Sequence, residues 1–335
     1  MLSISYLLVL ASICAEPSGH IALVSGDTQQ DQCVCVLDVS SGQVARIGPG
    51  RGDGCPVWAP RGDRLAFTSA ESGQAAVRIT APDGRDARRI DHAHPPTSRL
   101  AWAPGGGRLA YAAGEGADSR IVVYDLTTGT ESEWGKGAAG LLSPAWITDE
   151  QLVAIGVAPG KKGASTDLYW VMPDEISPAP GIQPGGKAYV EWAPAPHPSG
   201  LGLAFESNDG GDREVFILSF QRGYLLDVSN HRAADWNPVW APSGRWLAFE
   251  SFRDGRRGVY RVNPERLLVL PVAPGDDADN WAPTWAPDGQ WLAFVSTRSG
   301  NADLWAADVS GGELRQLTSG PAGDYAPAWR PRAGQ

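Results

Sequence analysis

The chain has 335 residues, of which 42% are hydrophobic and 20% are charged, and its formal net charge is −10 with an isoelectric point near 5.0. Nucleic acids and anionic membrane surfaces attract basic patches, so this acidic balance argues against both as partners. The length and the apolar content are those of a soluble globular protein with a large core.

The N-terminal residues form the first predicted element. Residues 1–15 contain an apolar stretch of about a dozen residues that matches the hydrophobic region of a signal peptide and is too short to span a bilayer. We therefore expect 1–15 to be a signal peptide cleaved near Ala15, a periplasmic or extracellular mature protein, and no integral membrane span. A lipid anchor at Cys14 is disfavoured, because Ile13 stands where a lipobox has a small residue.

After this leader, tryptophan recurs at an almost constant interval. The successive spacings are 44, 44, 46, 48, 45 and 44 residues, between Trp58, Trp102, Trp146, Trp192, Trp240, Trp285 and Trp329. A period in the forties with turn residues at constant offsets is typical of a β-propeller, in which each repeat forms one four-stranded blade.

The repeat nearest the C-terminus shows the unit most clearly. Trp285-Ala-Pro-Asp-Gly289 predicts a tight hairpin turn, because proline fixes φ and glycine accepts a positive φ. Apolar alternation with β-branched and aromatic residues then predicts strands within 291–296, 303–308 and 313–318.

The copy that contains Trp192 has a different spacing. Trp192 lies 12 residues before Ala204, whereas Trp285 lies 8 residues before Ala293. We therefore expect the first hairpin of this copy to carry four additional residues.

The two ends of the chain complete each other. Residues 325–331 form an opening strand with no later strands after it, and 21–25 and 33–38 are later strands with no opening strand before them. Together they make one blade, so six intact copies and one split copy predict an all-β, seven-bladed propeller over residues 19–331. Such a closure leaves no open sheet edge.

Several copies share a longer motif. Asp235-Trp-Asn-Pro-Val-Trp240 is followed by Ala-Pro-Ser-Gly244 and later by Ser251-Phe-Arg-Asp-Gly255. This pattern resembles the WD-like propeller repeat of the TolB family, and the resemblance covers nearly the whole chain after residue 18. It implies a propeller that acts as a scaffold in the cell envelope. The seven copies counted here differ from the six blades of that family.

The cysteines that remain after leader removal are odd in number: Cys33, Cys35 and Cys55. Cys33 and Cys35 share one face of a strand, which is poor geometry for a mutual disulfide. Two alternatives stay open, a bridge from Cys55 to one of the other two, or three small buried hydrophobic side chains.

The sequence lacks the common short motifs of catalytic sites. It contains no Gly-x-Ser-x-Gly, no phosphate-binding loop, no Cys-x-x-Cys and no His-Glu-x-x-His. His92, His94 and His231 could hold a metal if they converged, as in the related oligogalacturonate lyases, although histidines in polar loops are usually plain surface residues. A carbohydrate-active lyase or hydrolase with a site at the channel mouth is therefore one alternative function, and a propeller subunit that works with a separate peptidase is another.

The candidate site lies where the innermost strands begin. The residue five before each repeat tryptophan is expected at one mouth of the central channel: Asp53, Thr97, Leu141, Lys187, Asp235, Asn280 and Asp324. Four of these, Asp53, Asp235, Asn280 and Asp324, come from consecutive blades, and Asp276, Asp277 and Asp279 lie in a loop on the same rim.

Two interpretations of these acids are open. They cap local turns, as aspartate does before an extended proline, or they form a half-ring that binds Ca²⁺ or a basic peptide segment. No other cofactor is expected. The sequence as a whole favours an exported, monomeric and non-catalytic scaffold that binds a protein or peptide of the cell envelope.

Overall fold

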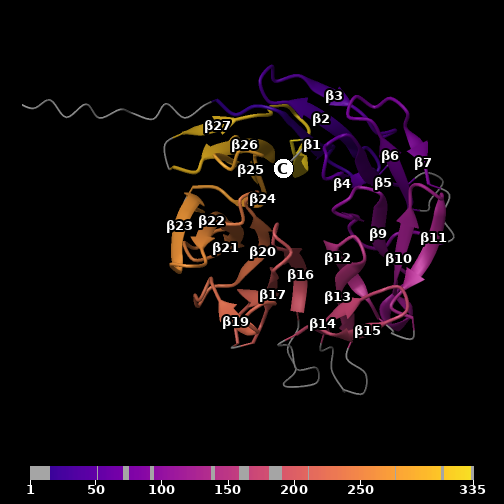
Figure 1. Ribbon diagram of the computed structural model, residues 1–335. Coiled ribbons are helices and arrows are strands. Elements are labelled where there is room, and N and C mark those ends of the chain that lie inside the picture. Colours follow the sequence, from indigo (N-terminus) through magenta and orange to yellow (C-terminus); the bar gives the residue numbers. More distant parts are fainter. Residues whose placement is uncertain are drawn as a thin grey trace, which may run out of the picture.

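The computed structural model describes residues 16–50, 52–70, 75–90, 94–136, 140–157, 166–180, 191–209, 211–275, 277–310 and 313–332. These residues form seven four-stranded antiparallel sheets, arranged as blades around a central axis (Figure 1). The predicted all-β, seven-bladed propeller is confirmed. Within the described residues the only helical element is a 3-10 turn at Gly116–Asp118, and no helix is long and apolar enough to cross a membrane. The predicted signal peptide, 1–15 with Cys14, lies outside these ranges.

We number the blades in chain order by their innermost strand. Blade 1 contains β4 (Gly54–Trp58), β5 (Leu65–Ser69), β6 (Ala76–Thr80) and β7 (Arg88–Arg89). Blade 2 contains β8 (Ala101–Trp102), β9 (Arg108–Ala113), β10 (Arg120–Asp125) and β11 (Thr130–Trp134). Blade 3 contains β12 (Leu142–Thr148), β13 (Gln151–Val157), β14 (Thr166–Val171) and β15 (Ile176–Pro178).

The remaining blades follow the same order. Blade 4 contains β16 (Glu191–Pro196), β17 (Gly202–Ser207), β18 (Glu214–Ser219) and β19 (Tyr224–Asp227). Blade 5 contains β20 (Asp235–Trp240), β21 (Leu247–Ser251), β22 (Gly258–Asn263) and β23 (Leu268–Ala273). Blade 6 contains β24 (Asn280–Trp285), β25 (Trp291–Ser296), β26 (Asp303–Asp308) and β27 (Leu314–Gln316). Blade 7 contains β28 (Asp324–Trp329), β1 (His20–Ser25), β2 (Cys33–Asp38) and β3 (Val44–Arg46).

Blade 7 joins the two ends of the chain, as predicted. β28 pairs antiparallel with β1, with Trp329 opposite Ile21 and Asp324 opposite Ser25. The innermost strand of each blade contacts that of the next blade around the whole ring. We call the end where the innermost strands begin the loop rim, and the opposite end, which is built from the tight hairpins, the hairpin rim.

The core lies between the blades rather than inside any one of them. The second strand of a blade is apolar on both faces, and β25 is buried along its whole length because it is covered by a neighbouring blade on each side. For example, Val259 of blade 5 packs with Leu292 and Phe294 of blade 6. Each blade therefore depends on its neighbours for burial, which is the physical basis of repeat architectures.

The repeat tryptophans also link the blades by hydrogen bonds. The indole Nε1 donates to a backbone carbonyl in the innermost strand of the preceding blade at 2.9–3.1 Å, in the pairs Trp58–Ala328, Trp102–Val57, Trp146–Ala101, Trp240–Ala195 and Trp285–Val239. A tryptophan at this position thus buries its ring and satisfies its polar N–H at once.

The expectation of a longer first hairpin in blade 4 is wrong. Pro196 pairs with Leu203, in the register in which Trp240 pairs with Leu247, so both hairpins have the same length. Trp192 instead pairs with Glu206, the position that Trp236 takes opposite Glu250. The additional residues therefore precede β16, and Glu191 takes the strand position expected for Lys187, which lies outside the described residues.

A β-bulge interrupts six of the seven innermost strands. In each bulge the residue before a proline adopts a positive φ between 46° and 54°, at Cys55, Ser143, Ala193, Asn237, Ala282 and Ala326. The register of the pairing shifts at the same points. A bulge disrupts the ladder locally and re-aims side chains and backbone N–H groups.

The three described cysteines are free thiols. Cys35 is buried, which fits the interpretation as a small hydrophobic residue, and its Sγ lies 3.5 Å from that of the half-buried Cys33. Cys55 is exposed, so the expectation of a buried residue is wrong for it. It forms no bridge to the other two.

Candidate functional site

Four of the residues predicted at the channel mouth lie at the start of an innermost strand or directly before it, but they do not face solvent. Asp53, Asp235 and Asn280 are fully buried and Asp324 is 8% exposed. Asp279 is half-buried in the loop before β24. Of the two other acids expected in this loop, Asp277 is exposed and Asp276 lies outside the described residues.

Protein groups bind these buried side chains. Asp53 Oδ2 accepts hydrogen bonds from the backbone N–H of Gly50 at 2.8 Å and of Val34 at 3.3 Å. Asp235 Oδ2 lies 3.0 Å from Nη2 of Arg253, which is an ion pair buried between strands.

The same position in the next blade is filled by an uncharged residue. Asn280 Oδ1 accepts a 2.9 Å hydrogen bond from Arg298, as Asp235 does from Arg253. The geometry therefore supports a structural role in each blade, for which no negative charge is required. Binding of Ca²⁺ or of a basic peptide by Asp53, Asp235, Asp279, Asn280 and Asp324 stays a prediction.

Metal binding by His92, His94 and His231 was the less favoured interpretation of the histidines. Nδ1 of His231 accepts a hydrogen bond from the backbone N–H of Ala233. The backbone N–H of His231 donates to the carboxylate of Glu214 at 3.3 Å. Across the described ranges, which include His94 but not His92, no group of three His, Cys, Asp or Glu side chains is placed to hold a metal ion.

A pair of acids is buried at the junction of blades 4 and 5. Glu214 is 7% exposed, and its Oε2 accepts a 2.5 Å hydrogen bond from the hydroxyl of Ser229. Burial raises the pKa of Glu214 to about 7, and the negative charge of nearby Asp235 acts in the same direction. Burial also raises the pKa of Asp235 itself, although Ser251 and Arg253 oppose that rise.

The side chains that are open to the loop rim come one residue later along each strand. Four consecutive blades carry a half-buried aromatic residue there, namely Trp192, Trp236, Trp281 and Tyr325. We call these four residues the aromatic arc. Phe252, which is 46% exposed, packs against Trp236 with ring centroids 5.0 Å apart. Blades 1, 2 and 3 have Gly54, Ser98 and Leu142 at the equivalent positions.

Two arginines lie against the aromatic arc. The guanidinium of Arg213 is 4.4 Å from the ring centroid of Trp192. That of Arg257 lies between two indoles, 5.4 Å from Trp236 and 5.5 Å from Trp281. Both arginine side chains keep about a third of their surface exposed, at 38% and 33%. Cation–π attraction therefore arranges flat aromatic and guanidinium surfaces in alternation along the rim.

Two buried glutamates hold these arginines. Glu250 has no exposed surface and pairs with Arg257, and Glu206 pairs with Arg213 at 3% exposure. Each glutamate also accepts a backbone N–H that the bulge of the next blade has freed, Glu206 from Asn237 at 2.6 Å and Glu250 from Ala282 at 2.8 Å. Burial raises the pKa of Glu206, and the hydrogen bond from the backbone N–H of Asn237 and the charge of Arg213 oppose that rise.

The arc and its two arginines have the composition of a protein-interaction surface. Tryptophan, tyrosine and arginine are the residues that most often dominate the energy of protein interfaces. Their signal was visible in the sequence, since Asp235-Trp236, Asn280-Trp281 and Asp324-Tyr325 repeat an acid or amide followed by an aromatic residue. Because side chains alternate along a strand, the acid and the aromatic residue point to opposite faces.

Comparison with curated sequences gives short matches. No protein-family model matches the chain. Over 71 residues it is 41% identical to the Tol-Pal system protein TolB of Wolbachia pipientis wMel, a match that covers 21% of the chain and 17% of that protein. The chain thus spans less than a fifth of the curated relatives it matches.

Solved structures match over most of the chain. TolB from Acinetobacter baumannii has a TM-score of 0.64 at 16% identity, covering 95% of this chain and 68% of that one. The propeller domain of the Trilobed protease from Pyrococcus furiosus has a TM-score of 0.68 at 14% identity, covering 91% and 97%. Oligogalacturonate lyase from Vibrio parahaemolyticus has a TM-score of 0.67 at 13% identity, covering 87% and 88%. At these identities the likeness establishes the fold alone, and the chain is a seven-bladed β-propeller similar in fold to TolB.

Proposed function

We propose that this protein is a non-catalytic binding scaffold of the cell envelope, and that its protein or peptide partner docks on the aromatic arc. The observation that supports this surface is the run of half-buried Trp192, Trp236, Trp281 and Tyr325 in consecutive blades. The TolB proteins among the matches are consistent with such a role.

The arc is also organised before any partner arrives. Glu206 and Glu250 hold Arg213 and Arg257 against the indoles, so few rotamers remain to be lost on binding. Preorganisation of this kind improves affinity because less conformational entropy is lost. The carboxylates of Glu206 and Glu250 are already bonded to arginine, which leaves the accessible parts of the aromatic rings and of the two guanidinium groups as the contact surface.

Affinity purification tests the docking surface. The wild-type chain and the double variant Trp236→Ala/Trp281→Ala are immobilised and exposed to a detergent extract of the native envelope. We expect a specific partner to be retained by the wild type and lost from the variant. Trp246→Ala is the matched control, because Trp246 is also half-buried under an arginine, with Arg261 at 4.2 Å, but lies at the hairpin rim. A partner that the arc variant retains as strongly as the wild type contradicts the proposal.

Export is the second part of the proposal. When the protein is produced in a bacterial host with its own leader, the chain recovered from the periplasm or medium should begin near Ala15 or Glu16. N-terminal sequencing measures this directly. An intact Met1 on a cytoplasmic product would contradict the envelope location.

A further inference from the structure

A concave surface lies at the hairpin rim, on the opposite end of the ring from the aromatic arc. It is a cavity of about 410 Å³ between blades 4 and 5, of the size of ligand sites in proteins. Ile217 of β18 faces the groove from blade 4, and the hairpins of the two blades form its edges. We call it the blade 4–5 groove.

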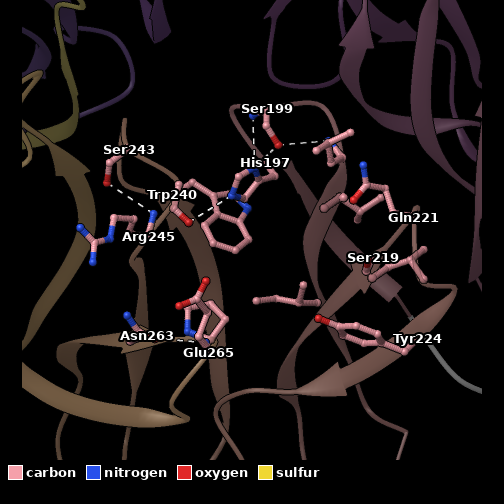
Figure 2. A pocket seen from close by; sticks show the side chains of 17 residues that line it. His197, Ser199, Ser219, Gln221, Tyr224, Trp240, Ser243, Arg245, Asn263 and Glu265 are labelled. Carbon is pink, nitrogen blue, oxygen red and sulfur yellow. Dashed lines mark hydrogen bonds between the residues drawn. The ribbon is translucent and has the colours of Figure 1, made fainter.

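His197 bridges the two blades on one side of the groove. Its Nε2 lies 3.1 Å from the carbonyl oxygen of Gly244 in blade 5, and its Nδ1 lies 2.7 Å from the hydroxyl of Ser199. Because a carbonyl oxygen only accepts, Nε2 carries the proton and Nδ1 accepts. The imidazole packs edge-on against the indole of Trp240, with the two ring centroids 4.6 Å apart. This contact holds Trp240 in the middle of the groove (Figure 2).

Exposed apolar side chains contribute to this groove. Among the described residues eight large hydrophobic side chains are exposed, and two of them, Leu201 and Tyr224, belong to the bordering hairpins and face the groove. Surface patches of this kind mark interaction sites, whereas single scattered apolar residues do not.

The turns that border the groove carry more arginine than acid, and Arg245 and Glu265 are the charged residues that line the groove itself. Arg222, Arg245 and Arg266 stand in the same hairpins with one acid, Glu265, although the chain carries a net charge of −10. The side chains of these four residues have no hydrogen bond or ion pair with another described residue. Figure 2 shows Arg245 on one side of Trp240 and Tyr224 on the other.

We propose that the blade 4–5 groove is a second binding site, which takes an acidic peptide segment with an apolar anchor residue. The anchor packs between Trp240, Tyr224 and Leu201, and its flanking carboxylates meet the unpaired arginines. A carbohydrate would use the polar groups and one aromatic face but would leave the exposed Leu201 side chain uncovered, so the apolar part of the lining favours a peptide.

Fluorescence anisotropy with a defined probe tests this site. The probe is the labelled, end-capped hexapeptide Asp-Glu-Leu-Phe-Glu-Asp, compared with one peptide in which Leu-Phe is replaced by Ala-Ala and one in which all four acids are replaced by Lys. We expect saturable binding of the first peptide at a one-to-one ratio, and binding at least about tenfold weaker for each of the others. A lysine peptide that binds as tightly as the acidic one overturns the proposal.

Two pairs of substitutions separate the charge from the anchor. Arg245→Glu/Arg266→Glu and Leu201→Ala/Tyr224→Ala each alter exposed side chains, so the fold is retained, and each should raise the Kd about tenfold or more. Arg88→Glu and Leu314→Ala change equally exposed residues on β7 and β27 and should leave the Kd unchanged.

The outcome for this groove is independent of the proposed docking on the aromatic arc. Trp236→Ala/Trp281→Ala should leave the affinity for the acidic hexapeptide unchanged. If that variant loses the peptide while the groove variants keep it, the peptide binds at the arc and the groove proposal is wrong. The absence of saturable binding up to about 1 mM peptide also overturns it.

Discussion

The indole Nε1 of Trp58 donates a 2.9 Å hydrogen bond to the backbone carbonyl of Ala328, which joins two residues 270 positions apart. Trp58 ends the innermost strand of blade 1, and Ala328 lies near the end of β28 in blade 7. The same bond recurs between other neighbouring blades, but here it links the first complete blade to the last strand of the chain. The ring is therefore closed by side chains as well as by strand pairing.

Removal of the last strand should be severely destabilising. Deletion of residues 324–335 removes β28, exposes the edge of β1 and uncovers the apolar residues that β28 packs against. Thermal unfolding followed by circular dichroism measures the effect. The single variant Trp58→Phe, which loses the hydrogen bond but keeps an aromatic ring, should cost only about 1 kcal/mol. If the truncated chain melts within about 2 °C of the intact one, closure through blade 7 does not stabilise the ring.

Loss of the Glu250 carboxylate should destabilise the loop rim. Glu250→Ala leaves the N–H of Ala282 and the amide of Asn237 without their acceptor, and Arg257 without its ion pair. We expect a loss of about 3 kcal/mol in the free energy of unfolding, measured by urea titration. Glu265→Ala, which removes an exposed and unpaired glutamate, should change it by less than about 0.5 kcal/mol. Equal effects of the two changes would show that the buried glutamate does not hold the rim.

Glycine should relieve strain at a bulge. Ala326 is exposed and has a φ of 48°, a conformation that costs a residue with a Cβ about 1 kcal/mol or more. Ala326→Gly should therefore raise the free energy of unfolding by about 0.5 kcal/mol, because the added freedom of the unfolded chain offsets part of the gain. Ala328→Gly, two residues later in the same strand, should lower it. A fall for both variants would indicate that the bulge is unstrained.

Stability should fall as pH rises from about 4.5 to about 7. Glu214 loses its proton near 4.5 in the unfolded chain but near 7 in the folded one, so between these values the native state binds more protons. The groups that face it are Ser229, the N–H of His231, Asp227 and Asp235. Melting temperatures measured across this range should decline for the wild type and decline less for Glu214→Gln. A Glu265→Gln control should keep the wild-type slope, and an unchanged slope in Glu214→Gln would contradict the assignment.

The positions of the blades could be predicted because a local pattern determines them. The interval between Trp240 and Trp285 and the turn at Gly289 depend only on neighbouring residues along the chain. In blade 4 the tryptophan interval gave the wrong strand position. Trp192 occupies the position that Trp236 has in blade 5, and Pro196 occupies the position of Trp240. A tryptophan suits either position, and only the pairing partner on the next strand distinguishes them.

The sequence by itself determined the architecture: seven repeats of one four-stranded unit, with a blade shared between the two ends. Periodicity and turn chemistry are sufficient for this, because each blade is specified by residues close in sequence. Only the tertiary structure decided which side chains face the loop rim. Asp235 and Trp236 are adjacent in the sequence, yet the first is buried beside Arg253 and the second stands in the aromatic arc. That difference arises from the strand alternation and from the blade packed alongside, which buries one face and leaves the other open.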